Sequence, residues 1–88
     1  MNKIFSNTAW NDILSWQDQD KKTLKKIIQL IKDIERNGHN SIGQTEVLKG
    51  SLSGFYSKHI DKKNRLVYKI LENNDLYILS CKGHYNDK

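Results

Sequence analysis

One apolar stripe constrains the fold of this 88-residue chain more than any other feature of the sequence. Between residues 21 and 36, apolar side chains recur at intervals of three and four residues, which is the spacing of one face of an α-helix: Leu24, Ile27, Ile28, Ile31 and Ile34. A helix with such a face must bury it against another element. The chain is long enough for a single domain, residues 1–88, so that element must come from the rest of this sequence.

A shorter helix is expected before the stripe. Ser6 or Asn7 can cap it by accepting a hydrogen bond from a free backbone N–H, and three apolar side chains then fall on one side: Trp10, Ile13 and Leu14. The polar residues 17–20 interrupt this pattern, and Asp20 is suited to cap the second helix. Asn37-Gly38 ends that helix, because glycine accepts the left-handed conformation common at helix C-termini.

From Gly54 onward the pattern changes to strands separated by short polar turns. The expected strands are residues 55–60, 65–71 and 76–82. They should form an antiparallel meander, and Lys3-Ile4-Phe5 should join it at an edge or beside the last strand. The face of this sheet is the available partner for both helices. The sequence therefore predicts an α+β domain of order βααβββ, with two N-terminal helices packed on an antiparallel-rich sheet and a polar loop from His39 to about Ser51.

Alternation along these strands predicts two different faces. Leu66, Tyr68 and Ile70 point one way, while Arg65, Val67 and Lys69 point the other. Helices would cover the apolar face and leave a wet face beside the loop that contains Glu46. Gly83 could let the chain turn off the last strand and carry the residues that follow it over this wet face.

Charge narrows the class of partner. The chain carries a formal charge of +5 and has a pI of about 9.4. Six basic residues lie between 21 and 36 against two acidic ones, and six more lie between 49 and 69 against Asp61 alone. This distribution favours a polyanionic partner, either nucleic acid or an acidic protein segment, bound more weakly as salt rises. The alternative is that these lysines only solvate a small protein.

Several classes of protein are disfavoured. No apolar run is long enough to span a bilayer, and residues 1–6 lack the apolar core of a signal peptide. We therefore expect a soluble cytoplasmic protein without a membrane partner. No metal or other cofactor is expected, because the spacing of Cys81, His39, His59 and His84 matches no metal-ligand pattern. No disulfide within the chain is expected either, because Cys81 is the single cysteine.

Four motifs resemble, in order and spacing, the YoeB/Txe-type toxins of the RelE/ParE superfamily. They are Glu46-Val47-Leu48-Lys49, Leu52-Ser53-Gly54-Phe55-Tyr56-Ser57, Arg65-Leu66-Val67-Tyr68 and Cys81-Lys82-Gly83-His84-Tyr85. The resemblance implies the RelE-like microbial ribonuclease fold. It also implies the toxin of a type II toxin-antitoxin pair: a ribosome-dependent endoribonuclease, or mRNA interferase, that cuts mRNA in the ribosomal A site and so inhibits translation.

The resemblance also implies roles for particular residues. Glu46 is the expected general base, His84 the general acid and Arg65 the phosphate clamp, while Tyr85 positions the substrate. The expected RNA-binding residues are basic: Lys49, Lys58, His59, Lys62 and Lys63. Two positions depart from the family pattern. Thr45 stands where members commonly have proline, which should loosen the segment carrying Glu46, and His59 stands where some members have arginine.

This set of residues suits RNA cleavage without a metal. The ribose 2′-OH serves as an internal nucleophile on the neighbouring phosphate, so the reaction needs a base for its proton, an acid for the departing 5′-oxygen and cations for the negative charge. Glu46, His84 and Arg65 can supply one of each. Taken alone, Glu46 could be paired with Lys49, Arg65 could be a strand-edge cation and Tyr85 could be a packing residue.

The expected partners follow from the same resemblance. They are a cognate antitoxin of the YefM/Axe type, whose acidic segment folds over the basic face, together with the ribosome and its mRNA. Operator DNA is met only through the toxin-antitoxin complex, and a homodimer is compatible with the sequence. Two other functions stay open: a ParE-like toxin that inhibits DNA gyrase without cutting RNA, and an RNA-binding module in which Tyr56 or Tyr85 stacks on bases.

Overall fold

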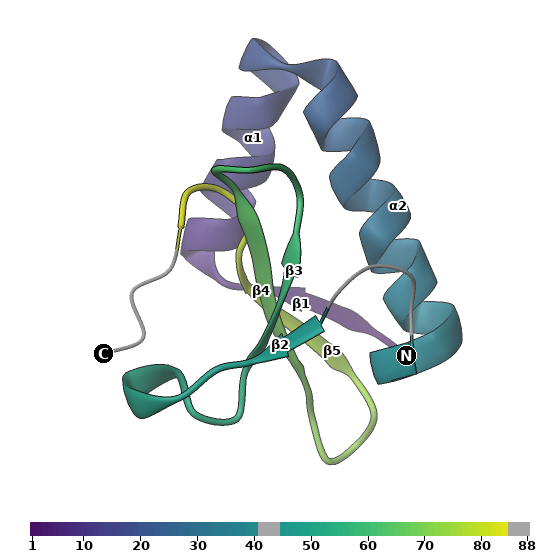
Figure 1. Ribbon diagram of the computed structural model, residues 1–88. Coiled ribbons are helices and arrows are strands. Elements are labelled where there is room, and N and C mark those ends of the chain that lie inside the picture. Colours follow the sequence, from purple (N-terminus) through teal and green to yellow (C-terminus); the bar gives the residue numbers. More distant parts are fainter. Residues whose placement is uncertain (41–44, 85–88) are drawn as a thin grey trace.

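The structure is a computed structural model that describes residues 1–40 and 45–84. A five-stranded sheet forms one layer and a helical hairpin forms the other (Figure 1). In chain order the elements are β1 (Lys3–Phe5), α1 (Asn7–Gln19), α2 (Lys21–Asn37), η1 (Gly38–Asn40), β2 (Thr45–Val47), η2 (Gly50–Leu52), β3 (Tyr56–His59), β4 (Arg65–Ile70) and β5 (Leu76–Ser80), where η1 and η2 are single 3₁₀ turns. The predicted α+β class and the packing of two helices on the sheet are confirmed.

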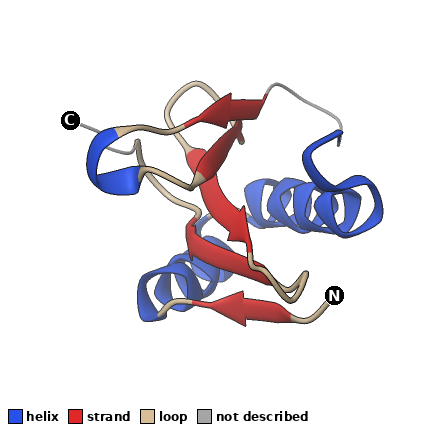
Figure 2. Cartoon of the chain, turned by 90° about the horizontal axis from the view of Figure 1, so that it is seen from below, coloured by secondary structure: helices blue, strands red, loops and turns tan. Residues whose placement is uncertain are grey.

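The strands lie in the order β1-β5-β4-β3-β2. Seen from below, β1 and β2 lie at opposite edges of the sheet (Figure 2). β1 runs parallel to β5, with Lys3 opposite Leu76, and all other neighbours are antiparallel. The predicted meander and the placement of the short first strand beside the last one are therefore confirmed.

Both helices share one core with the sheet. Buried side chains of α1 and α2 meet Leu66 and Tyr68 of β4 and Leu76 and Ile78 of β5 in a single cluster. On α2 the stripe is buried at Ile27, Ile31 and Ile34, whereas Ile28 is 42% exposed. The predicted caps are present: the Asp20 carboxylate accepts from the N–H groups of Lys22 and Thr23, and Gly38 takes a φ of 59°.

The prediction that Trp10, Ile13 and Leu14 form the buried side of α1 is wrong for Trp10 and Leu14. Trp10 and Leu14 are exposed, while Ala9 and Trp16 are buried. Residues seven apart lie on one helix face, so turning Ala9 and Trp16 toward the sheet carries Trp10 outward. The Trp10 ring packs edge-on against Phe5, 6.3 Å away between centroids. The Ser6 cap is confirmed, since its hydroxyl accepts a hydrogen bond from the Ala9 N–H at 3.0 Å.

Strand β2 was not predicted, because its residues fell within the expected polar loop. Thr45, Glu46 and Val47 pair with Lys58, Ser57 and Tyr56 of β3. Three residues are too few for an alternating pattern to stand out. The pairing with β3 makes this segment a strand, so the Glu46 backbone belongs to the sheet.

No helix in the ranges 1–40 and 45–84 is long and apolar enough to cross a membrane.

Cys81 is completely buried, as expected for a small apolar residue. Burial, with a smaller effect of Asp12, raises the pKa of its thiol from 9.0 to about 12. The unfolded chain loses this proton at a lower pH than the folded chain, so the stabilising effect is complete below pH 9 and falls as pH rises toward 12.

We expect iodoacetamide at pH 8 to alkylate the folded protein about 1,000-fold more slowly than the urea-unfolded protein. Mass spectrometry over time measures both rates, and equal rates would contradict the burial of Cys81.

Candidate active site

The sheet has a second face, opposite the helices, on which candidate site residues gather. Paired residues of neighbouring strands project to the same face, and alternate residues along one strand do so too. Glu46 pairs with Ser57, and Ser57 with Val67, while His59 pairs with Arg65. These five side chains therefore share the face away from the core, which we call the open face.

The open face is less wet than the sequence indicates. Ser57 and Val67 are 0% and 1% exposed, and Leu48, which follows β2, is 2% exposed. Val67 and Leu48 lie outside the main core cluster. The middle of this face is thus dry, and the ionisable groups stand around it.

Glu46 lies directly beside His59. Its Oε1 atom is 3.1 Å from His59 Nε2, and both side chains remain about two-fifths exposed, at 41% and 44%. A carboxylate that is both oriented by an imidazole and open to solvent can accept a proton from a bound hydroxyl group. His59 was predicted only as an RNA contact, and its contact with Glu46 was not foreseen.

Arg65 is 8% exposed and its guanidinium group folds over the turn between β3 and β4. Nη1 donates to the carbonyl oxygens of Asp61, Lys62 and Asn64 at 2.7, 3.3 and 3.1 Å. A guanidinium group carries five N–H donors, so three bonds from one nitrogen fix its orientation without using its full capacity. The guanidinium group is thus held at the start of β4.

The turn that holds Arg65 is itself ordered by Asp61. The Asp61 carboxylate accepts hydrogen bonds from the backbone N–H groups of Lys63 and Asn64 and from the Asn64 side chain. The side-chain bond from Asn64 is the main cause that lowers the pKa of Asp61. Lys62 and Lys63 stand exposed on this turn, where they can contact a polyanion as predicted.

The segment after β5 is tied at both of its ends. Helix α1 holds Cys81: the Trp16 indole donates to its carbonyl at 2.9 Å, and the Asp12 carboxylate accepts from its N–H at 2.9 Å. Lys82 Nζ then donates to Ser15 Oγ of the same helix at 2.8 Å. These contacts fix the direction in which the chain leaves the sheet.

Gly83 joins this segment to the Arg65 turn. Its N–H donates to Asn64 Oδ1 at 2.7 Å and its carbonyl accepts from the Arg65 N–H at 3.0 Å. Gly83 has a φ of 77°, a region that favours glycine, so its predicted role at the turn off β5 is supported. In Figure 1 the yellow segment runs beside the turn between β3 and β4. The structure thus brings the backbone that leads into His84 next to Arg65, while Tyr85 lies outside the described residues.

Asn64 is a site-building residue that the sequence did not single out. It closes the turn through Asp61 and also anchors Gly83. The Asp-x-x-Asn spacing from 61 to 64 was the available signal, since aspartate at the start of a turn commonly accepts backbone bonds two and three residues on.

The structure corrects the prediction for Lys58. This side chain is 1% exposed and lies on the core side of β3, opposite His59, so its ammonium group cannot reach RNA at the surface. The reason is the strand alternation, which turns adjacent residues to opposite faces. Lys49 is exposed at the start of η2, and His59 is exposed beside Glu46, so both remain available for RNA.

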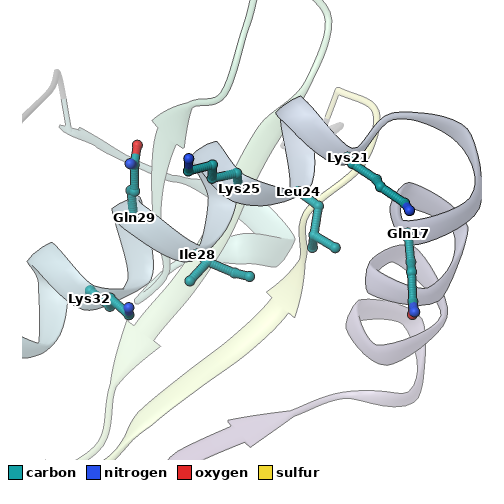
Figure 3. Close-up of a pocket in the computed structure, with 7 residues that line it drawn as sticks. All are labelled: Gln17, Lys21, Leu24, Lys25, Ile28, Gln29 and Lys32. Carbon is teal, nitrogen blue, oxygen red and sulfur yellow. The ribbon is translucent and has the colours of Figure 1, made fainter.

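A hollow of about 370 Å³ lies elsewhere, along the helices. Leu24 and Ile28 line it together with the polar residues Gln17, Lys21, Lys25, Gln29 and Lys32 (Figure 3). Its lining residues include no carboxylate and no imidazole. Within residues 1–40 and 45–84 no group of three or more His, Cys, Asp or Glu side chains could hold a metal ion.

Comparison with known proteins supplies the family. The family model described as "YoeB-like toxin of bacterial type II toxin-antitoxin system" matches residues 5–85. The chain belongs to the YoeB toxin family. The resemblance expected from the four motifs is thereby confirmed.

Relatives of this YoeB-family chain match it over nearly their whole length. It is 44% identical to Toxin YoeB of Escherichia coli strain K12, over 97% of this chain and 100% of that protein. YoeB in a heterotetrameric YoeB-YefM complex from Staphylococcus aureus is 45% identical with a TM-score of 0.87, and the match covers 97% of this chain and 98% of that one. A YoeB dimer from the same species gives 45% identity, a TM-score of 0.86 and the same coverage.

Proposed function

We propose that this YoeB-family toxin is a metal-independent, ribosome-dependent endoribonuclease that cuts mRNA in the A site and so inhibits translation. One observation carries the proposal. Three segments far apart in the sequence meet around the β3–β4 turn: β2, which bears the Glu46 carboxylate, β4, which begins with Arg65, and the segment after β5, in which Gly83 leads into His84. A carboxylate, a guanidinium group and an imidazole are the chemical groups that cleavage of RNA by its own 2′-OH requires.

The proposed reaction assigns one step to each group. Glu46 takes the proton of the 2′-OH, whose oxygen attacks the adjacent phosphorus. Arg65 stabilises the negative charge on the phosphorane, and His84 gives a proton to the departing 5′-oxygen. The products are a 2′,3′-cyclic phosphate and a 5′-hydroxyl end, and Tyr85 is proposed to position the substrate.

The size of the protein favours dependence on the ribosome. An acid or a base in place contributes about 100- to 10,000-fold to a rate, so the rest must come from holding the RNA in line for attack. The open face and the segments beside it offer few proposed substrate contacts: His59 on the face, Lys49 at the start of η2, and Lys62 and Lys63 in the β3–β4 turn. The ribosome, which already holds mRNA in the A site, would supply the missing alignment, and the proposed site of action is the cytoplasm.

We further propose that an antitoxin holds the toxin inactive. A relative from S. aureus has been solved in complex with YefM. In this chain the helical hollow combines apolar Leu24 and Ile28 with Lys21, Lys25 and Lys32, which suits an acidic segment with apolar side chains. Operator DNA would be met through the toxin-antitoxin complex, and the dimer of the S. aureus relative makes a homodimer a reasonable state for this toxin.

Primer extension on a translated mRNA tests the proposed function directly. With ribosomes, the purified toxin should produce discrete cuts in register with the reading frame, and without ribosomes the same mRNA should stay intact. Cuts that need neither ribosomes nor translation would overturn the A-site mechanism. If no cuts appear under any condition, a ParE-like, non-nucleolytic toxin becomes the better interpretation, and gyrase inhibition should then be measured.

A further inference from the structure

Lys58 has an unusual environment for a lysine. Lys58 is only 1% exposed, and its Nζ atom donates a hydrogen bond to Thr45 Oγ1 at 2.6 Å. Burial lowers the pKa of Lys58, while the charge of Asp33 on α2 opposes this change. Burying an ammonium group is costly unless polar partners receive it, so the contact with Thr45 is a strong local constraint.

The partner of Lys58 immediately precedes Glu46. β2 is an edge strand of three residues whose neighbour in the sheet is β3 alone. The position of Glu46 therefore depends on how firmly β2 is attached to β3. The backbone pairing of Thr45 with Lys58 and of Glu46 with Ser57 supplies one attachment. Such a short edge ladder is prone to fraying.

Side chains add an attachment on each face of this ladder. On the core face, Lys58 reaches the Thr45 hydroxyl, and on the open face, His59 reaches the Glu46 carboxylate at 3.1 Å. The two donors are adjacent in β3 and their two partners are adjacent in β2. Side-chain contacts thus hold β2 on both faces of the sheet: Thr45 on the core face and Glu46, the proposed base, on the open face.

We propose that Lys58 is a positioning residue for Glu46, acting through the hydroxyl group of Thr45. The proposal rests on the proposed function, since it concerns the same site. Thr45 was expected to loosen the Glu46 segment, but its hydroxyl is the atom to which Lys58 bonds. A threonine and a buried lysine together hold the strand, and Lys58 does so from the face that substrate does not reach.

The size of the effect follows from geometry. Misplacing a reacting group by 1 Å costs on the order of 100-fold in rate. Loss of one side-chain contact should leave the backbone ladder in place and shift Glu46 by less than that. We therefore expect about a tenfold fall in kcat when the contact is removed, with KM for programmed ribosomes unchanged.

Four variants test the proposal. Thr45→Val keeps the size of the side chain but removes the hydroxyl, and Lys58→Met removes the ammonium group and keeps the length. Each should cleave mRNA on the ribosome about tenfold more slowly. Thr45→Ser restores the hydroxyl and should stay within about twofold of the wild type. The double variant Thr45→Val/Lys58→Met should be no slower than either single variant, because both remove the same contact.

A second measurement does not depend on cleavage. By NMR, amide hydrogen exchange at Glu46 and Val47 should be faster in Thr45→Val than in Thr45→Ser. The His59 ring resonances in Thr45→Val should also move toward those of Glu46→Gln, in which the carboxylate is absent. Lys58→Met gives the same readout if Thr45→Val does not fold.

The outcomes separate this proposal from the proposed function. Thr45→Val with wild-type hydrogen exchange and wild-type kcat would overturn the positioning role, and so would equal losses in Thr45→Val and Thr45→Ser. Rates that fall additively in the double variant would also overturn it, because the two residues would then act separately. Full cleavage by Glu46→Gln would instead contradict the proposed function and leave the hydrogen-exchange result standing.

Discussion

Replacing Glu46 with glutamine is expected to lower the rate of mRNA cleavage on the ribosome by about 100- to 10,000-fold, because the amide cannot accept the 2′-OH proton. Glutamine keeps the shape of the side chain and can still bond to His59. Since the Glu46 side chain is 41% exposed, the free energy of unfolding should change by no more than about 0.5 kcal/mol. Single-turnover cleavage of a defined mRNA in the A site measures the rate.

The matched control for this variant is Glu72→Gln. Glu72 is exposed and lies between β4 and β5, away from the open-face cluster, so its replacement removes the same charge without touching the site. Sedimentation with ribosomes should give equal binding for both variants. If Glu46→Gln cleaves as fast as Glu72→Gln, Glu46 is not the base.

The second large effect is expected for His84→Gln. Without an acid for the departing 5′-oxygen, the cleavage rate should fall by about 100- to 10,000-fold while ribosome binding is kept. Glutamine can donate a hydrogen bond but cannot transfer a proton. His39→Gln is the matched control, because the His39 ring packs at a tilt against Tyr56, 3.9 Å away between centroids, on the core side of β3 and should not affect the chemistry.

An altered substrate distinguishes the acid from the base. If the bridging 5′-oxygen at the cut is replaced by sulfur, the leaving group has an ordinary thiol pKa near 8.5 and departs without a proton. His84→Gln should then cut this mRNA at close to the wild-type rate, whereas Glu46→Gln should stay slow. Equal impairment of both variants on the sulfur substrate would contradict the assignment of His84 as the acid. A ParE-like toxin or a passive RNA-binding module predicts no cleavage to restore.

Periodicity predicted most of the fold because burial on one face leaves a repeating pattern. The Ile27, Ile31 and Ile34 stripe identified α2, and the alternation in residues 65–70 identified β4 and its two faces. Periodicity failed where the element was short or the helix was polar on most sides. β2 has three residues and takes its structure from β3, and α1 turns Ala9 and Trp16 inward instead of Trp10.

The motifs led to the proposal of Glu46, Arg65 and His84 as site residues, because the chemistry limits which residue types can serve. They did not predict the contacts that hold these residues. These contacts come from residues to which no such chemical limit applies, such as Asn64 and Asp12. They also depend on which face of the sheet each strand residue occupies. Lys58 illustrates the second cause: one step along β3 separates the exposed side chain of His59 from the buried side chain of Lys58.

The parallel pairing of β1 with β5 has a consequence for how this protein is made. Lys3 lies opposite Leu76, so the earliest strand to be synthesised cannot find its sheet neighbour until nearly all of the described chain has left the ribosome. His84 follows later still. Helices α1 and α2 can form early from local contacts, but the sheet that gathers Glu46, Arg65 and His84 must wait. The proposed site is therefore assembled only after the last of its described residues, His84, has been synthesised.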